Sequence, residues 1–280
     1  RDAQESRGLG DVYKRQTVGT IGAGTLVFAA GTATAVIGEP VGAFVAALVA
    51  AEVGRRVAGK TSVDIVLVPL VTIITGGGTG IYLSPFFAAM MKSLGALINT
   101  ATELQPIPMG IAVAVLMGMI LTLPISSAAL AIALNLSGLA AGAATVGCAA
   151  NMIGFAAISF KENGIGGFIA QGIGTSMLQV PNIIRNPWIW LPAIVSSAIL
   201  GPISTAVLGM TSSAAGAGMG TSGLVGQFAM LEVMGHSPEV LLQIAVMHFI
   251  APAIISVLVA KWMTRRGMIK AGDLTLSKMD

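Results

Sequence analysis

Long apolar runs separated by short polar stretches occupy most of the 280-residue chain. Runs such as VAVLMGMILTL and PAIISVLVA are apolar at every position, without the alternation of a half-buried strand or the polar stripe of a soluble amphipathic helix. About 20 apolar residues cross a bilayer as a helix. The pattern therefore predicts an all-α, polytopic integral membrane protein with about eight or more transmembrane helices. The predicted crossings are 18–37, 40–58, 63–83, 84–99, 107–135, 138–160, 187–209 and 239–263.

Two further apolar stretches, 164–186 and 212–235, carry too many Gly, Ser, Thr and Gln residues for simple lipid-facing helices. Irregular backbone at membrane depth is tolerated only where protein or a water-filled cavity satisfies its polar groups. We therefore predict that both stretches are re-entrant or discontinuous segments that line a site.

Composition supports the membrane class. The chain is 55% hydrophobic and only 10% charged, whereas a soluble domain carries roughly 25% charged residues. The 36 glycines and the 5% aromatic content predict helices packed closely through small residues. A transmembrane barrel is disfavoured because its strands would alternate in polarity. We predict no nucleic-acid partner, because no basic surface interleaved with aromatic residues is evident.

Basic residues cluster in RRVAGK (55–60) and in KWMTRRGMIK (261–270). The positive-inside rule places both clusters in the cytoplasm. An even number of crossings is then expected between them, and residues 266–280 are predicted to be a short cytoplasmic tail.

The chain opens with the charged stretch RDAQESRGLGDVYKRQ. Its part SRGLGDVYKRQ (6–16) is the translation, in one frame, of an adapter DNA used in transposase-based sequencing. A charged cytoplasmic leader is the competing interpretation. We predict that residues 1–16 derive from the adapter and are excluded from fold reasoning. Residues 17–265 are then an N-terminally truncated membrane transport domain.

The stretch GRRVAGKT (54–61) matches a phosphate-binding loop letter for letter. That loop must follow a buried strand within an α/β domain, whereas an apolar run of helical length, VGAFVAALVAAEV, precedes it here. We interpret Arg55, Arg56 and Lys60 as a cytoplasmic basic loop, with Glu52 paired to a neighbouring Arg on one helix face.

Two residues inside apolar runs are expected to be structural. Cys148 is the only cysteine, so no internal disulfide can form, and we expect it to be buried. His248, in IAVMHFIAP, is expected to be a satisfied neutral histidine. No metal-ligand cluster is evident, and no metal or cofactor is predicted.

Carboxylates and carboxamides near the apolar segments are candidates for binding a substrate. Glu39 lies between Gly and Pro at the junction of two apolar runs, and Glu103 and Gln105 lie in NTATELQPIP. Together these groups offer donors and acceptors for sugar hydroxyls. The alternatives are an interfacial carboxylate at a helix start for Glu39 and a water-exposed loop for the other two.

Asn182 and Arg185, in VPNIIRNP, have a similar polar character, as does the KENG stretch at 161–164, for which a solvated turn is the simpler interpretation. Glu232 and His236 are four residues apart and would meet on one helix face if the helix continued through Gly235. Such a pair could relay a proton or orient a substrate. Ordinary hydrogen bonding at a helix end is the alternative.

Several long stretches, in order, resemble a known family. They are GEPVGAFVAALVAAEVGRRVAGKTSVDIVLVPLVTI, ATELQPIPMGIAVAVLMGMILTLPISSAAL, FKENGIGGFIAQGIGTSMLQVPNIIRNPWIWLPAIVSSAILGPI and AGAGMGTSGLVGQ. The chain, from about Gly22 to Arg266, resembles the stand-alone membrane IIC components of the bacterial phosphoenolpyruvate-dependent sugar phosphotransferase system, in the branch often described as toxin-regulator-like. The resemblance implies an all-helical transporter in the bacterial cytoplasmic membrane, commonly a homodimer.

The resemblance also implies a sugar substrate and cytoplasmic IIA and IIB partners, with the phosphoryl-transfer residue on a separate IIB subunit. Glu39-Pro40 is similar to the Glu-Pro pair beside the sugar hydroxyls of better-known IIC proteins, but no His near Glu39 completes the usual pairing. Arg55, Arg56, Lys60 or Arg185 would face the phosphorylated product or the partner. Two alternatives stay open: a membrane sugar sensor or regulator without transport, and a proton-coupled transporter that uses Glu39 or Glu232.

Overall fold

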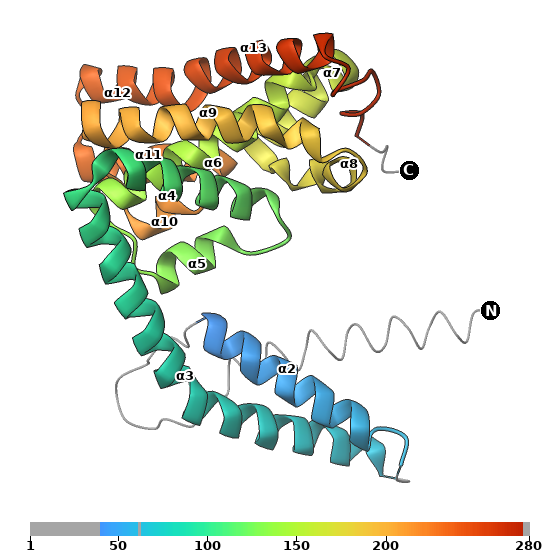
Figure 1. Ribbon diagram of the computed structural model, residues 1–280. Coiled ribbons are helices and arrows are strands. Elements are labelled where there is room, and N and C mark those ends of the chain that lie inside the picture. The colour runs from blue at the N-terminus through green and yellow to red at the C-terminus, as the bar shows by residue number, and fades with distance from the viewer. Residues whose placement is uncertain (1–39, 61–62, 277–280) are drawn as a thin grey trace. The chain divides into compact units, whose positions relative to one another are not determined.

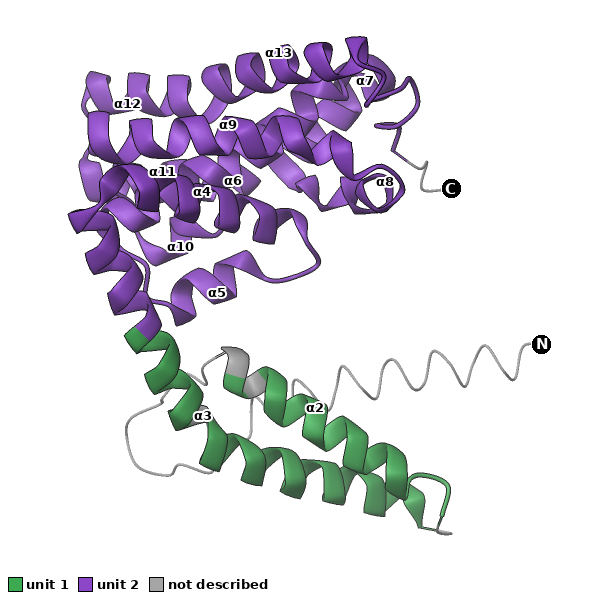
Figure 2. Cartoon of the chain, in the orientation of Figure 1, with its two compact units in different colours: residues 1–93 green, residues 94–280 purple. Residues whose placement is uncertain are grey.

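The computed structural model describes residues 40–60 and 63–276 (Figure 1). Every regular element within these ranges is helical, and the only β feature among them is an isolated bridge between Gly138 and Ser212. The predicted all-α class is confirmed. The chain divides into two compact units, Arg1–Ser93 and Leu94–Asp280 (Figure 2).

The described part of unit 1 holds α2 (Pro40–Val57) and most of α3 (Asp64–Leu104), which ends in unit 2. Small residues allow these helices to approach closely, since a Cβ added to Gly54 would lie 2.4 Å from the Thr72 side chain. The predicted crossing 40–58 corresponds to α2. The predicted crossing 63–83 is confirmed by the apolar span Asp64–Leu83, which is the first part of α3. The prediction of a separate helix at 84–99 is wrong, because α3 continues through Pro85. The predicted crossing 18–37 lies outside the described residues.

Unit 2 contains the end of α3 and a bundle of long helices with two chains of short helical pieces among them. The bundle comprises α4 (Pro106–Thr122), α5 (Ser127–Ala133), α6 (Gly138–Ile158), η3 (Pro187–Trp190), α9 (Leu191–Pro202), η4 (Ile203–Val207), α12 (Pro238–Ile244), η6 (Ala245–Ile250) and α13 (Ala251–Arg265). The short pieces are α7 (Phe160–Ile169), η1 (Ala170–Gly174), η2 (Ser176–Gln179), α8 (Val180–Arg185), α10 (Ala214–Ala217), η5 (Ser222–Leu224) and α11 (Val225–Met234).

Helix α6 is the centre of unit 2. Almost all of it is buried, and α4, α9 and α13 pack around it. Its contact with α4 depends on glycine, because a Cβ added to Gly147 would lie 2.0 Å from the carbonyl oxygen of Ala114. The contact between α4 and α9 depends on glycine too, since a Cβ added to Gly201 would lie 2.3 Å from the carbonyl oxygen of Gly110. Where lipid replaces water, dense packing of this kind holds helices together.

Helices α4 and α6 run in the same direction, since Ala114 approaches Gly147 and Thr122 approaches Asn151. The chain must therefore return between them, through residues 123–137. The prediction of a single crossing at 107–135 is wrong for this reason. Pro124 lacks the N–H that would continue α4, and the Ser126 hydroxyl accepts a hydrogen bond from Ala129 N (3.2 Å) to start α5.

The crossings predicted at 138–160, 187–209 and 239–263 are confirmed as helical spans. In the described part of the chain, four helical spans are long and apolar enough to cross a membrane: Asp64–Leu83, Gly138–Ile158, Pro187–Val207 and Pro238–Arg265. The predicted number of eight or more is not confirmed. Large apolar side chains such as Ile184 (76% exposed) and Val207 (74%) cover the outside of unit 2. An apolar exterior around a buried polar interior suits a lipid environment.

The close contact between α4 and α6 predicts that Gly147→Ala destabilises unit 2, because the new methyl group would overlap the Ala114 carbonyl. Overpacking of this kind costs about 1–3 kcal/mol. Melting temperatures of the purified protein in detergent measure the effect. Gly166→Ala is the matched control, since a Cβ there meets no atom within 4 Å. Equal melting temperatures for the two variants would contradict this account of the packing.

Candidate functional site

The stretch predicted at 164–186 is a broken hairpin. Its inward leg is α7 followed by the π-helical turn η1, the backbone is extended at Thr175, and η2 and α8 form the return leg. The legs are joined by buried side chains: Gln179 Nε2 donates to Gln171 Oε1 (2.8 Å), and Gln171 Nε2 donates to Ser159 Oγ (2.7 Å). Because Ser159 directly follows α6, this first hairpin enters from the C-terminal end of α6.

The stretch predicted at 212–235 is a second broken hairpin, formed by α10, η5 and α11. Its two ends lie together, because Thr211 N donates to Met234 Sδ (3.3 Å). Ser212 N donates to the carbonyl oxygen of Gly138, the first residue of α6 (3.3 Å). The second hairpin therefore enters from the opposite end of unit 2. The prediction that both stretches are discontinuous is confirmed.

The tips of the two hairpins meet at a contact here called the hairpin junction, which consists of Gly172, Gly174, Thr221 and Ser222. Thr221 Oγ1 donates to the Gly172 carbonyl (2.5 Å), and Ser222 Oγ donates to the Gly174 carbonyl (3.0 Å). A Cβ added to Gly220 would lie 2.7 Å from atoms of Cys148 and Ala149, in the middle of α6. With a rise of about 1.5 Å per residue along α6, the junction lies at about half the depth of a ~30 Å hydrocarbon core.

A cluster of buried polar side chains lies on α4, α6 and α9, close to the tip of the first hairpin. Asn151, fully buried on α6, donates from Nδ2 to Ser197 Oγ (3.1 Å) and accepts at Oδ1 from Trp190 Nε1 (3.1 Å). Thr122 Oγ1 lies 2.9 Å from Ser176 Oγ, next to the tip of the first hairpin. Cys148 is buried as expected. Sequence reasoning missed Asn151; the available signal was an amide in the middle of an apolar crossing.

Gln227, on α11, and His248, on the π-helical turn η6, form a second buried polar pair, with Gln227 Nε2 2.8 Å from His248 Nδ1. With the amide as donor, Nδ1 accepts and Nε2 carries the ring hydrogen. His248 Nε2 and Gln227 Oε1 are buried and have no hydrogen-bond partner. The expectation of a fully satisfied histidine is thus only half met. One donor and one acceptor remain free beside the return leg of the second hairpin.

Two of the predicted site residues share a cavity. Asn182 and Arg185, on α8, line a space of about 250 Å³ together with Gly272 and Thr275, which follow α13. Asn182 is nearly buried, and its Nδ2 donates to Gln179 Oε1 (2.8 Å). Gln171, Gln179 and Asn182, here called the amide ladder, thus connect this cavity beside the return leg to the inward leg of the first hairpin.

Four other predicted residues lie near the opposite end of unit 2 and are exposed: Glu103, Gln105, Glu232 and His236. Contacts between Thr205 and Pro106 and between Thr211 and Met234 place them there. The structure does not bring them together with Asn182 and Arg185. Helix α11 ends at Met234, because Gly235 has a φ of +87°. Glu232 and His236 therefore do not share a helix face. Glu39 lies outside the described residues.

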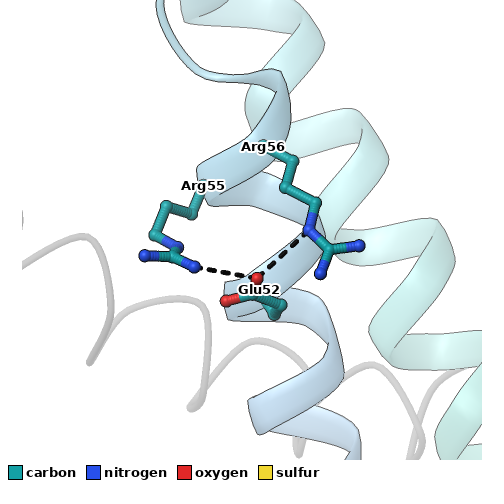
Figure 3. A network of polar contacts seen from close by, with 3 residues as sticks. All are labelled: Glu52, Arg55 and Arg56. Atoms are coloured by element: carbon teal, nitrogen blue, oxygen red, sulfur yellow. Dashed lines mark hydrogen bonds and ion pairs between the residues drawn. The ribbon is translucent and has the colours of Figure 1, made fainter.

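The third predicted group lies in unit 1, at the C-terminal end of α2 (Figure 3). Glu52 Oε1 accepts from Arg55 (2.9 Å) and from Arg56 (3.1 Å), which confirms the predicted pairing. Lys60 is exposed in the turn that follows. A helix precedes GRRVAGKT where a phosphate-binding loop requires a strand. This stretch is a basic helix end.

The charges of unit 2 separate by end within the described residues. Near the C-terminal end of α6 and the end of α13 lie most of its charged residues and all of its lysines and arginines: Lys161, Glu162, Arg185, Lys261, Arg265, Arg266, Lys270 and Asp273. The other end carries the acidic residues Glu103, Glu232 and Glu239, with no Lys or Arg. Figure 1 shows α7, α8 and the residues after α13 gathered at the basic end.

Unit 2 has an apolar exterior, and its two broken hairpins meet near half depth. These features define a helical membrane protein. In transporters, substrate sites are formed by discontinuous helices of this type. The family model described as Phosphotransferase system, EIIC matches residues 12–276, and the chain belongs to this family. The resemblance to the IIC components of the phosphotransferase system is thereby confirmed, and the toxin-regulator-like branch stays a prediction. No curated protein and no solved structure gives a significant match to the chain. The division at residue 17 stays a prediction.

The hairpin junction predicts that Thr221→Val destabilises unit 2, because the variant keeps the shape of the side chain but leaves the buried Gly172 carbonyl without its donor. An unsatisfied buried acceptor costs about 1–3 kcal/mol. Ser222→Ala is the comparison, and its effect should be smaller because the Ser222 bond is exposed. Thermal unfolding in detergent measures both variants. A Thr221→Val protein as stable as the parent would show that the tips are not held by this contact.

Proposed function

We propose that the chain is the membrane-spanning sugar permease subunit of a phosphotransferase system, which passes a sugar across the membrane to a cytoplasmic IIB partner for phosphorylation. Family membership supports a sugar phosphotransferase component. The observation that carries the proposal is the meeting of two opposed broken hairpins, through Thr221 and Gly172, beside the middle of α6. Substrate sites near the bilayer midplane, formed by discontinuous helices, are typical of secondary transporters.

A sugar is an uncharged ligand whose hydroxyl groups each donate and accept a hydrogen bond. His248 Nε2 and Gln227 Oε1 supply one donor and one acceptor that protein atoms leave unpaired. A buried polar atom without a partner costs about 1–3 kcal/mol. A hydroxyl that accepts from the imidazole and donates to the carboxamide would recover this energy. We therefore assign these residues to the sugar site.

The opposed hairpins suggest how access would alternate. Each hairpin reaches the junction from one end of unit 2, and two hydrogen bonds join the tips. Withdrawal of one hairpin would open the junction to one side while the other hairpin keeps it closed. Movement of discontinuous elements around a fixed midplane site is a common form of alternating access.

The basic end of unit 2 is proposed to face the cytoplasm, following the positive-inside rule. The cavity beside Asn182 and Arg185 would then lie on the side where phosphorylation occurs. Arginine binds phosphate strongly, so Arg185 is proposed to contact the phosphorylated product or the IIB partner. Arg55, Arg56 and Lys60 are proposed as a second partner-facing group. A homodimer and a sugar-binding role for Glu39 stay predictions.

The decisive experiment expresses the chain with candidate IIA and IIB proteins and measures whether labelled sugars accumulate in cells as phosphate esters. We expect phosphorylated accumulation that depends on this chain. Binding without accumulation would favour the sensor alternative. Uptake that persists without phosphoenolpyruvate but collapses with the proton gradient would favour the proton-coupled transporter. Either result would overturn the permease proposal.

Substitutions test the assigned sugar site. Gln227→Leu and His248→Phe should each reduce uptake at least tenfold, since one lost hydrogen bond to a hydroxyl corresponds to about 1.4 kcal/mol or more. Glu239→Gln, in the exposed first turn of α12, is the control and should transport normally. Membrane abundance is measured in parallel. Normal uptake by both site variants would exclude this pair from the sugar site.

A further inference from the structure

Residues 268–276, here called the latch segment, are held by the inward leg of the first hairpin. Glu162 accepts hydrogen bonds from Gly272 N (3.0 Å), Leu274 N (3.1 Å) and Thr275 Oγ1 (2.8 Å). The next residue of the leg, Asn163, adds two more bonds to the latch backbone. A single turn at the base of α7 thus binds the latch segment through five hydrogen bonds.

The return leg holds the same segment. Gln179 Nε2 donates to the Leu274 carbonyl (3.0 Å), and Asn182 Nδ2 donates to the Thr275 carbonyl (3.0 Å). Asn186, just after α8, donates to the Met268 carbonyl (2.9 Å). The latch segment therefore bridges both legs of the hairpin at its base. These hydrogen bonds tie both legs to the chain that follows α13.

The hydrogen bonds from the return leg to the latch segment come from Gln179 and Asn182, the last two members of the amide ladder. Both side chains are buried, and the latch carbonyls supply acceptors that satisfy them. Departure of the latch would leave both amides with free donors, and one of them, Asn182, lines the 250 Å³ cavity. Such donors suit hydroxyl groups. The same cavity provides space beside α8 for a displacement.

We infer that the latch segment locks the first hairpin from the basic end: the hairpin is closed while the segment is bound and opens when it leaves. In this proposal, Glu162 and Asn163 of the KENG stretch bind the latch segment, which can leave. A solvated turn was the simpler interpretation of these residues from the sequence. The transport consequence rests on the proposed function, whereas the locking itself does not. A passive anchor for the chain after α13 is the competing explanation.

A disulfide lock distinguishes the two. In the variant Asn186→Cys with Asp273→Cys, the cysteines replace two side chains that are in contact, since Asn186 Nδ2 donates to Asp273 Oδ2 (2.8 Å). A disulfide requires neighbouring side chains of this kind. Cys148 is buried and takes no part. The readouts are hydrogen–deuterium exchange of residues 170–179 in lipid nanodiscs and, separately, phosphorylated sugar uptake. Both compare the oxidised with the reduced form of the same protein.

We expect oxidation to slow exchange at the hairpin tip at least tenfold and to abolish uptake, and reduction to reverse both effects. The control pair Asn99→Cys with Ser137→Cys replaces a 3.3 Å contact away from the hairpin and should change neither readout on oxidation. Equal exchange and equal uptake in the oxidised and reduced latch variant would show a passive anchor and overturn the inference.

A loosening variant gives an independent test that needs no disulfide. Asn163→Ala removes two hydrogen bonds from the latch and should accelerate exchange at residues 170–179 about tenfold, corresponding to about 1.4 kcal/mol of opening free energy. Unchanged exchange would contradict the latch. If no form of the protein transports any sugar, the permease proposal fails, while the exchange measurements still decide whether the segment locks the hairpin.

Discussion

The need to pair every polar backbone group without help from water governs the architecture of unit 2. A hairpin that breaks at mid-depth exposes carbonyls that an unbroken helix would satisfy itself. Thr221 and Ser222 of one hairpin cap the Gly172 and Gly174 carbonyls of the other. The hydroxyl of Ser127 likewise donates a hydrogen bond to the Gly218 carbonyl (2.5 Å). Each broken segment therefore takes some of its hydrogen-bond partners from another element of unit 2.

Small side chains make this pairing geometrically possible. Glycines where α4 meets α6 and α9 bring the helices into backbone contact, which keeps the bundle narrow enough for short hydroxyls to reach carbonyls on neighbouring elements. The polar side chains that line the interior are mostly neutral amides and hydroxyls. Neutral groups suit an interior where an unpaired charge would cost far more than an unpaired amide. The charged residues gather instead at the two ends of unit 2.

Hydropathy predicted the elements well where one apolar run forms one helix, as at 138–160, and the Gly and Ser content of 164–186 and 212–235 predicted their breaks. It failed at 107–135, where Pro124 and Ser126 end one helix and start another within a single apolar run. Local signals of this kind are easily hidden by high overall hydrophobicity. Hydropathy predicted the crossing 63–83 correctly, but the separate helix predicted at 84–99 is absent, because Pro85 lies inside a continuous helix.

The candidate site was less accessible to sequence reasoning. Charge inside a membrane is costly, so ionisable residues within apolar runs were the predicted candidates. Two of them, Glu103 and Glu232, lie exposed near one end of unit 2. The buried amide side chains of Asn151, Gln179 and Gln227 bind partners that are distant in the chain, which the sequence alone does not reveal. Asn182 was found from its polar surroundings, but its link to the ladder becomes visible only in three dimensions.

The parallel course of α4 and α6 changes how the sidedness of this chain is counted. Two consecutive helices that point the same way require a third traverse between them, made here by residues 123–137, of which only seven form a helix, α5. If each apolar run is counted as one crossing, this traverse is missed, and the number of crossings is wrong by one. Everything before residue 106 would then be assigned to the wrong side of the membrane, even though each individual helix had been recognised correctly.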